Sequence, residues 1–99
     1  MTTELLILIA AHFACTDIAV ERPMNLDEAR HCASVYDEVK LSFVPGVSAS
    51  DYRRLDPGER SAVSKAGFLA FYQWRAENPE MVRHLVAVAR GEEALKAAG

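Results

Sequence analysis

The stretch from Leu5 to Cys15 constrains the fold most, because His12 is its only polar side chain. A helix of this composition is apolar on every side, which is the pattern of a helix surrounded by protein. The stretch is too short to cross a bilayer, which takes about 20 apolar residues. We therefore expect the rest of the chain, or a second copy of the chain, to cover this segment.

Signals for the starts and ends of helices divide the rest of the sequence. Residues that cap helix N-termini recur along the chain, and two of them precede a proline that suits the first helical position. No apolar/polar alternation of the kind typical of a strand persists over five residues. The expected helices begin at Thr2 or Thr3, Asn25, Ser48, Asp56 and Asn78, and they end before Pro23, at Pro45-Gly46, at Arg54, near Glu77 and at Gly91.

These signals predict an all-α fold, a small bundle of four main helices plus one short helix over 49–54, with the first helix central. A chain of 99 residues is the usual size of one domain. We expect a single helical domain over 1–99, in which residues 92–99 add one or two helical turns or form a frayed tail.

The third main helix, expected over 57–77, has two faces of different composition. Phe71 and Trp74 share an apolar face with the small residues Ala66, Gly67 and Ala70. Small side chains let another helix approach closely, so we expect a helix contact there. The second helix has a narrower apolar seam, made of Ala29, Cys32, Tyr36, Val39 and Phe43.

The opposite face of the third main helix carries Phe68 and Tyr72 one turn apart, among polar residues that include Arg75. Aromatic side chains are enriched at the cores of protein interfaces. Two interpretations stay open at this stage. Either the short helix or the C-terminal tail covers the aromatic pair within one chain, or Phe68, Tyr72 and Arg75 bind a partner.

Composition and charge favour association with protein over binding to membranes or nucleic acid. Apolar residues make up 51% of the chain, and a small domain of this kind keeps surplus apolar surface that association can cover. The net charge is −3, and no Lys or Arg precedes Arg22 to form the basic region of a signal peptide. We expect a cytoplasmic protein without a membrane partner, whose Cys15 and Cys32 stay reduced and pack as small apolar residues.

The sequence predicts no metal, cofactor or catalytic site. Four residues are of types that bind zinc. However, neighbours on a helix point about 100° apart, so His31 and Cys32 cannot easily face one ion. The four residues are His12, Cys15, His31 and Cys32.

A histidine inside an apolar helix needs a hydrogen-bond partner. For His12 we expect a backbone carbonyl or the hydroxyl of Tyr36 or Tyr52. A ligand-binding or catalytic role for His12 is a less favoured alternative, because the sequence places no nucleophile or acid beside it.

Taken together, these features favour a small interaction module rather than an enzyme. We expect it to form a homodimer or bind another protein, in a regulatory or accessory role typical of small bacterial or phage-derived proteins. The alternative is a nucleic-acid-binding regulator with a helix-turn-helix at the short turn Asn78-Pro79. Its contacts would come from Arg53, Arg54, Arg60, Arg83 and Arg90.

Overall fold

The computed structural model describes residues 1–95, and all regular structure in this range is helical. Four main helices and one short helix are present, which confirms the predicted all-α fold. The helices are α1 (Thr3–Glu21), α2 (Leu26–Ser42), α3 (Ala49–Arg54), α4 (Pro57–Glu77) and α5 (Pro79–Ala89).

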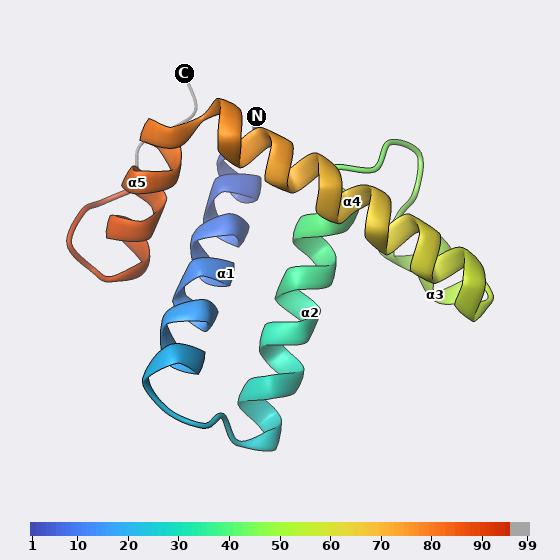
Figure 1. The fold of residues 1–99 in the computed structure, drawn as a ribbon, viewed down its shortest axis with the longest axis horizontal. Helices are drawn as coiled ribbons and strands as arrows, with labels where there is room; N and C mark the ends of the chain where they lie inside the picture. Colours follow the sequence, from blue (N-terminus) through green and yellow to red (C-terminus); the bar gives the residue numbers. More distant parts are fainter. Residues whose placement is uncertain (96–99) are drawn as a thin grey trace.

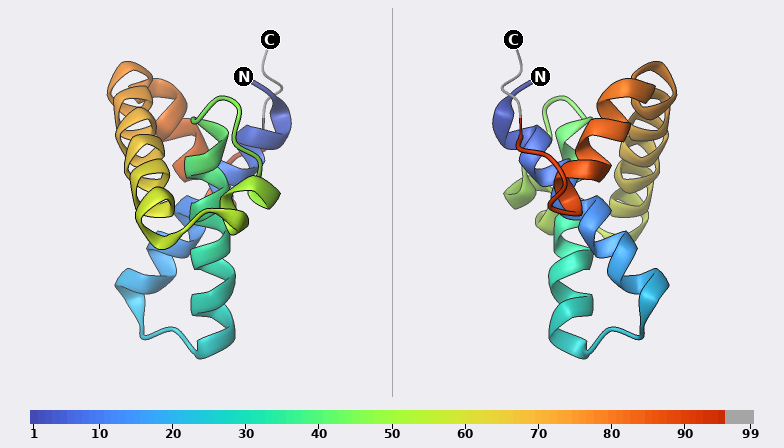
Figure 2. Two further views of the ribbon diagram at one scale, coloured as in Figure 1. Left: turned by 90° about the vertical axis from the view of Figure 1, so that its right-hand side faces the viewer. Right: turned by 90° about the vertical axis from the view of Figure 1, so that its left-hand side faces the viewer.

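α1 occupies the centre of the arrangement, as the sequence predicts. α1 and α2 form an antiparallel hairpin, and α5 packs against the other side of α1 (Figure 1). α4 packs on α2 and forms an outer layer that crosses the hairpin, while the short α3 lies beneath the N-terminal half of α4 (Figure 2). α1 therefore touches a helix on each flank, and α4 touches helices on one side only.

The helix boundaries follow from capping at the predicted residues. Asn25 and Glu28 form a reciprocal capping box at the start of α2, and Ser48 forms the same box with Asp51 at the start of α3. The Asp56 carboxylate accepts a hydrogen bond of 2.8 Å from the Glu59 backbone N–H at the start of α4. These local bonds satisfy amide groups that a helix N-terminus leaves without partners.

The junction of α4 and α5 differs from the prediction. Asn78 makes no side-chain cap on α5, and instead its Nδ2 donates a hydrogen bond of 2.8 Å to the Trp74 carbonyl at the end of α4. The Asn78 side chain therefore caps the end of α4 rather than the start of α5, where its carbonyl accepts from the Val82 N–H and Pro79 takes the first helical position.

The C-terminal end of α5 follows the prediction for Gly91. Gly91 has a φ of +75°, its N–H bonds to the Val88 carbonyl, and the Glu92 N–H bonds to the Ala87 carbonyl. This pattern is a Schellman motif, which glycine adopts without the steric cost of a Cβ. Residues 92–95 are not helical, and Leu95 packs against the core. The remainder of the expected tail, 96–99, lies outside the described residues.

The core is a single cluster to which α1 contributes most. Among the residues described, four of its seven fully packed members lie on α1, and α2, α4 and α5 contribute one each. They are Leu6, Ile9, Ala10, Phe13, Val39, Phe71 and Leu85.

The expectation that protein covers α1 on every side is wrong for a single copy of the chain. Ile7 keeps 53% of its surface exposed and Val20 is more exposed still. α2 and α5 pack against α1, and the Phe13 ring meets Phe71 of α4, but these contacts leave Ile7 and Val20 exposed. An apolar composition all round α1 therefore does not mean burial all round.

Of the small residues predicted to meet another helix, Gly67 contacts α2 at close range, whereas Ala66 is exposed, so the prediction is wrong for Ala66. A Cβ placed on Gly67 would lie 2.4 Å from the backbone oxygen of Lys40. That distance is shorter than any van der Waals contact, so only glycine fits where α4 crosses α2. Phe71 is fully buried one turn further along α4.

Candidate functional site

The outer face of α4 exposes three neighbouring large apolar side chains. Phe68, Leu69 and Tyr72 are 39%, 56% and 47% exposed, and the Phe68 and Tyr72 ring centroids lie 4.5 Å apart. We call these three residues the α4 patch. Neither α3 nor the described part of the C-terminal tail covers it, so the interpretation that the aromatic pair is covered within one chain does not hold for the described residues, and partner binding stays a prediction.

Arg75 does not extend from the α4 patch into solvent. Its guanidinium carbon lies 5.2 Å from the centre of the Phe13 ring, 5.7 Å from Phe71 and 5.1 Å from Tyr72. A guanidinium over aromatic faces is stabilised by the ring quadrupoles. Arg75 therefore joins the edge of the α4 patch to the core.

Sequence reasoning missed Leu69, the most exposed member of the patch. Five residues of α4, all exposed, recur at alternating steps of four and three, which is the spacing of a seam between two helices. None is charged, and Leu69 stands at the middle. The five are Ala62, Ala66, Leu69, Gln73 and Ala76. That spacing could have indicated the seam from the sequence.

His12 lies in an aromatic environment rather than beside a catalytic group. Its ring stacks on Tyr36 with centroids 4.5 Å apart and meets the edge of Phe71. Burial, followed by the nearby charges of Arg75 and Lys40, lowers its pKa below the ordinary value. Tyr36 is thus a neighbour of His12, as expected, but through ring stacking.

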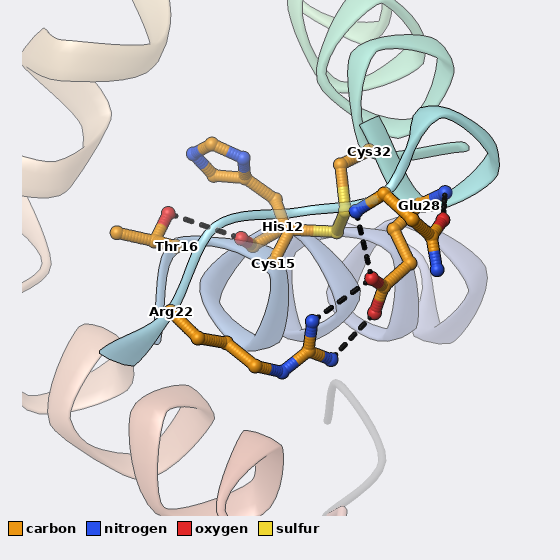
Figure 3. The surroundings of a disulfide bond; sticks show 7 residues. His12, Cys15, Thr16, Arg22, Glu28 and Cys32 are labelled. Atoms are coloured by element: carbon orange, nitrogen blue, oxygen red, sulfur yellow. Dashed lines mark hydrogen bonds and ion pairs between the residues drawn. A yellow bond between two sulfur atoms is a disulfide. The ribbon is translucent and has the colours of Figure 1, made fainter. Parts of the chain in front are cut away.

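Cys15 and Cys32 form a disulfide, so the expectation that they stay reduced is wrong. The bond joins α1 to the first turns of α2, with the Cα atoms 5.7 Å apart (Figure 3). It also removes both sulfurs from the set of zinc-type ligands considered above. Disulfides are typical of oxidising compartments, which does not favour the cytoplasmic location, and that location stays a prediction.

An ion pair closes the same end of the hairpin. Arg22 donates to both carboxylate oxygens of Glu28, at 2.9 and 2.6 Å, and Glu28 also accepts from the Asn25 N–H (Figure 3). The Arg22 hydrogen bond, and then the Asn25 N–H, lower the pKa of Glu28 to about 2. The bidentate geometry fixes the loop between α1 and α2.

The five arginines of the nucleic-acid alternative do not form one surface. Arg53, Arg54 and Arg60 lie on α3 and the start of α4, whereas Arg83 lies on α5 and Arg90 directly follows it, at the other end of the molecule (Figure 1). Arg90 is paired with Asp17 at 3.1 Å, and Arg83 lies 3.9 Å from Glu80.

α1 has one further property that the eleven-residue apolar stretch did not suggest. By length and composition alone, the helix Thr3–Glu21 would be able to cross a membrane, and 28% of its most apolar window is buried in this fold. Core helices and signal sequences pass the same test. Here four residues of α1 are part of the core and Cys15 is bonded to α2.

Comparison with protein-family models, with curated proteins and with solved structures finds no match to this chain. Functional inference therefore depends on the surfaces described above.

Proposed function

We propose that the protein is a helical interaction module that forms a homodimer through the outer face of α4. The observation that carries this proposal is the α4 patch, where Phe68, Leu69 and Tyr72 expose a continuous apolar surface on a helix packed from one side only. Apolar patches of this kind on small domains mark sites of association.

A second copy is the partner that the seam favours. A two-fold dimer uses the same surface on both chains, so that surface must be self-complementary. The uncharged seam, centred on Leu69 with alanines at both ends, satisfies this condition when two α4 helices run antiparallel. Each Ala62 would then face Ala76 of the other copy, and the small side chains would allow close approach.

Sedimentation velocity over a concentration series tests the proposal. We expect a dimer at micromolar concentration, and we expect L69K to be monomeric because it places two like charges at the centre of the interface. I7K is the matched control, since Ile7 is similarly exposed but lies on α1. A wild-type chain that stays monomeric at high micromolar concentration, or equal effects of the two variants, would overturn the proposal.

A further inference from the structure

A second surface feature lies beside the seam, where a solvent-open hollow of about 610 Å³ separates α2, α3 and α4. Its lining combines three basic, three aromatic and two hydroxyl-bearing side chains. No carboxylate lines it, although the whole chain carries a net charge of −3. A local excess of positive charge in an acidic protein selects anions.

Lys40 forms the fixed part of this positive charge. Its side chain is only 13% exposed, and its Nζ donates to Ser64 Oγ at 2.7 Å and lies 3.4 Å from Asp37. The same ammonium lies 4.5 Å from the centre of the Tyr36 ring. These three contacts hold the ammonium in one place at the wall of the hollow, where its charge can act on an anion without a direct hydrogen bond.

Arg60 and Lys65 supply the more accessible charges on the α4 side of the hollow. Arg60, Ser64 and Phe68 follow one another at steps of four residues, so they form one row along α4. Within the described chain, neither Arg60 nor Lys65 is in an ion pair closer than 4 Å. Their charge is therefore available to an anion.

The aromatic side chains differ in what they can offer. One face of Tyr36 is stacked against His12, and Lys40 lies over its ring, so Tyr36 acts as a wall. Tyr52 on α3 and Phe68 on α4 line the hollow from different helices, and both retain exposed surface. A planar ring could stack against either of them.

We propose that this hollow binds a nucleoside phosphate unit. The phosphate is held by Lys40, Arg60 and Lys65, and the base stacks on Tyr52 or Phe68. Positive grooves with aromatic platforms are the general means by which proteins hold unpaired nucleotides without reading sequence. The unit has two possible sources, a free nucleotide or a single strand. Phe68 is shared with the α4 patch, but the other residues that line the hollow lie outside that patch, so this inference does not rest on the α4 dimer.

Fluorescence anisotropy with a labelled single-stranded oligo(dT), at low salt and then at rising salt, tests the proposal. We expect binding that weakens with salt. K65E should weaken binding by about tenfold or more, because it reverses a charge at the rim. R83E makes the same change of charge on α5, away from the hollow, and should leave the affinity unchanged. Equal losses in the two variants would show that only net charge matters, and would overturn the proposal.

Competition identifies the source of the unit and tests the role of the rings. If AMP displaces the labelled strand at a concentration similar to the nucleotide concentration at which unlabelled strand does so, the hollow is a free-nucleotide site. If only the unlabelled strand displaces it, the hollow is a strand site. At least one of Y52A and F68A should weaken binding of whichever ligand binds, because one of these two rings carries the base. Inorganic phosphate that competes as well as AMP at equal ionic strength would overturn the proposal, as would no binding of either probe at low salt.

Discussion

α1 and α4 are the two longest helices, and both expose apolar side chains, but for opposite reasons. α1 lies between two helices and supplies most of the core, and its exposed residue Ile7 is left over from a helix that is apolar on all sides. α4 is an outer layer whose inner face carries Gly67 and Phe71, yet its outer face also carries the three exposed apolar side chains of the α4 patch. The difference indicates that the exposed apolar surface of α1 is a by-product of its composition. On α4 the fold does not need apolar residues on the outer face, so their presence there indicates a different purpose.

The largest expected effect on the free energy of unfolding distinguishes two isoleucines of α1, Ile9 and Ile7, which lie in the same apolar stretch of the sequence. Ile9 is fully buried, so I9D would place an uncompensated charge in the core and cost several kcal/mol, a large part of the roughly 5–15 kcal/mol that such a domain has. I7D should change the free energy of unfolding by less than about 0.5 kcal/mol, as surface substitutions do. Urea denaturation followed by circular dichroism measures both. Similar losses would mean that α1 is covered on all sides after all.

The disulfide should make the next largest contribution to the free energy of unfolding. It links α1 to α2 and does not involve α4. Cys15 and Cys32 are separated by 17 residues, and closing a loop of about 15 residues stabilises by about 3 kcal/mol. We expect a reductant to lower the urea midpoint of the wild-type chain and to leave a Cys15→Ala/Cys32→Ala variant unchanged. A wild-type midpoint that does not respond to reductant would contradict this prediction.

The contact of α4 with α2 can be tested by one substitution at two glycines. G67A should lower the free energy of unfolding by about 1–3 kcal/mol, because the added methyl group meets the Lys40 backbone. G58A lies in the first turn of the same helix, where a Cβ would have only a 3.4 Å contact with Asp56. There the higher helix propensity of alanine should stabilise by up to about 1 kcal/mol. The test is the thermal unfolding of the two variants. Equal shifts of Tm in G67A and G58A would exclude close packing at Gly67.

The smallest effect concerns the ion pair that closes the α1–α2 hairpin. Its contact with Arg22 lowers the folded pKa of Glu28 from 4.5 to about 2, so the stabilisation is complete above pH 4.5 and is lost as the pH falls through about 2. The pair is exposed, so the change in urea midpoint should be small. NMR titration of the Glu28 carboxyl should report the low pKa in the wild type and a higher pKa in R22Q, where the Asn25 N–H still donates to the carboxylate. An ordinary Glu28 pKa in both the wild type and R22Q would show that the ion pair with Arg22 does not form.

Much of the fold could be predicted from the sequence because the deciding interactions are local. Asn25, Ser48 and Asp56 each bond to an amide three residues away, and Gly91 adopts a positive φ that few other residues accept. Such bonds depend only on neighbouring residues, so their spacing in the sequence is sufficient to place the helix ends.

The remaining features depend on how helices are oriented, which spacing does not give. The disulfide requires α1 and α2 to bring Cys15 and Cys32 together, and the exposure of Ile7 depends on which sides α2 and α5 leave open. Asn78 could have served either neighbouring helix. The candidate site was predictable in part, since the sequence indicates Phe68 and Tyr72, but the hollow combines Lys40, Tyr52 and Lys65 from three helices.

The bond between Cys15 and Cys32 joins two helices that are already neighbours in the chain, so it does nothing to hold α4 or α5 in place. Opening of the molecule can therefore begin with α4 lifting from α2, while the cross-linked hairpin keeps its pairing. Backbone amide protons of α1 and α2 should then exchange with deuterated solvent more slowly than those of α4. Under reducing conditions the difference in exchange rate between these helices and α4 should become smaller, because the molecule should then open more nearly as one unit.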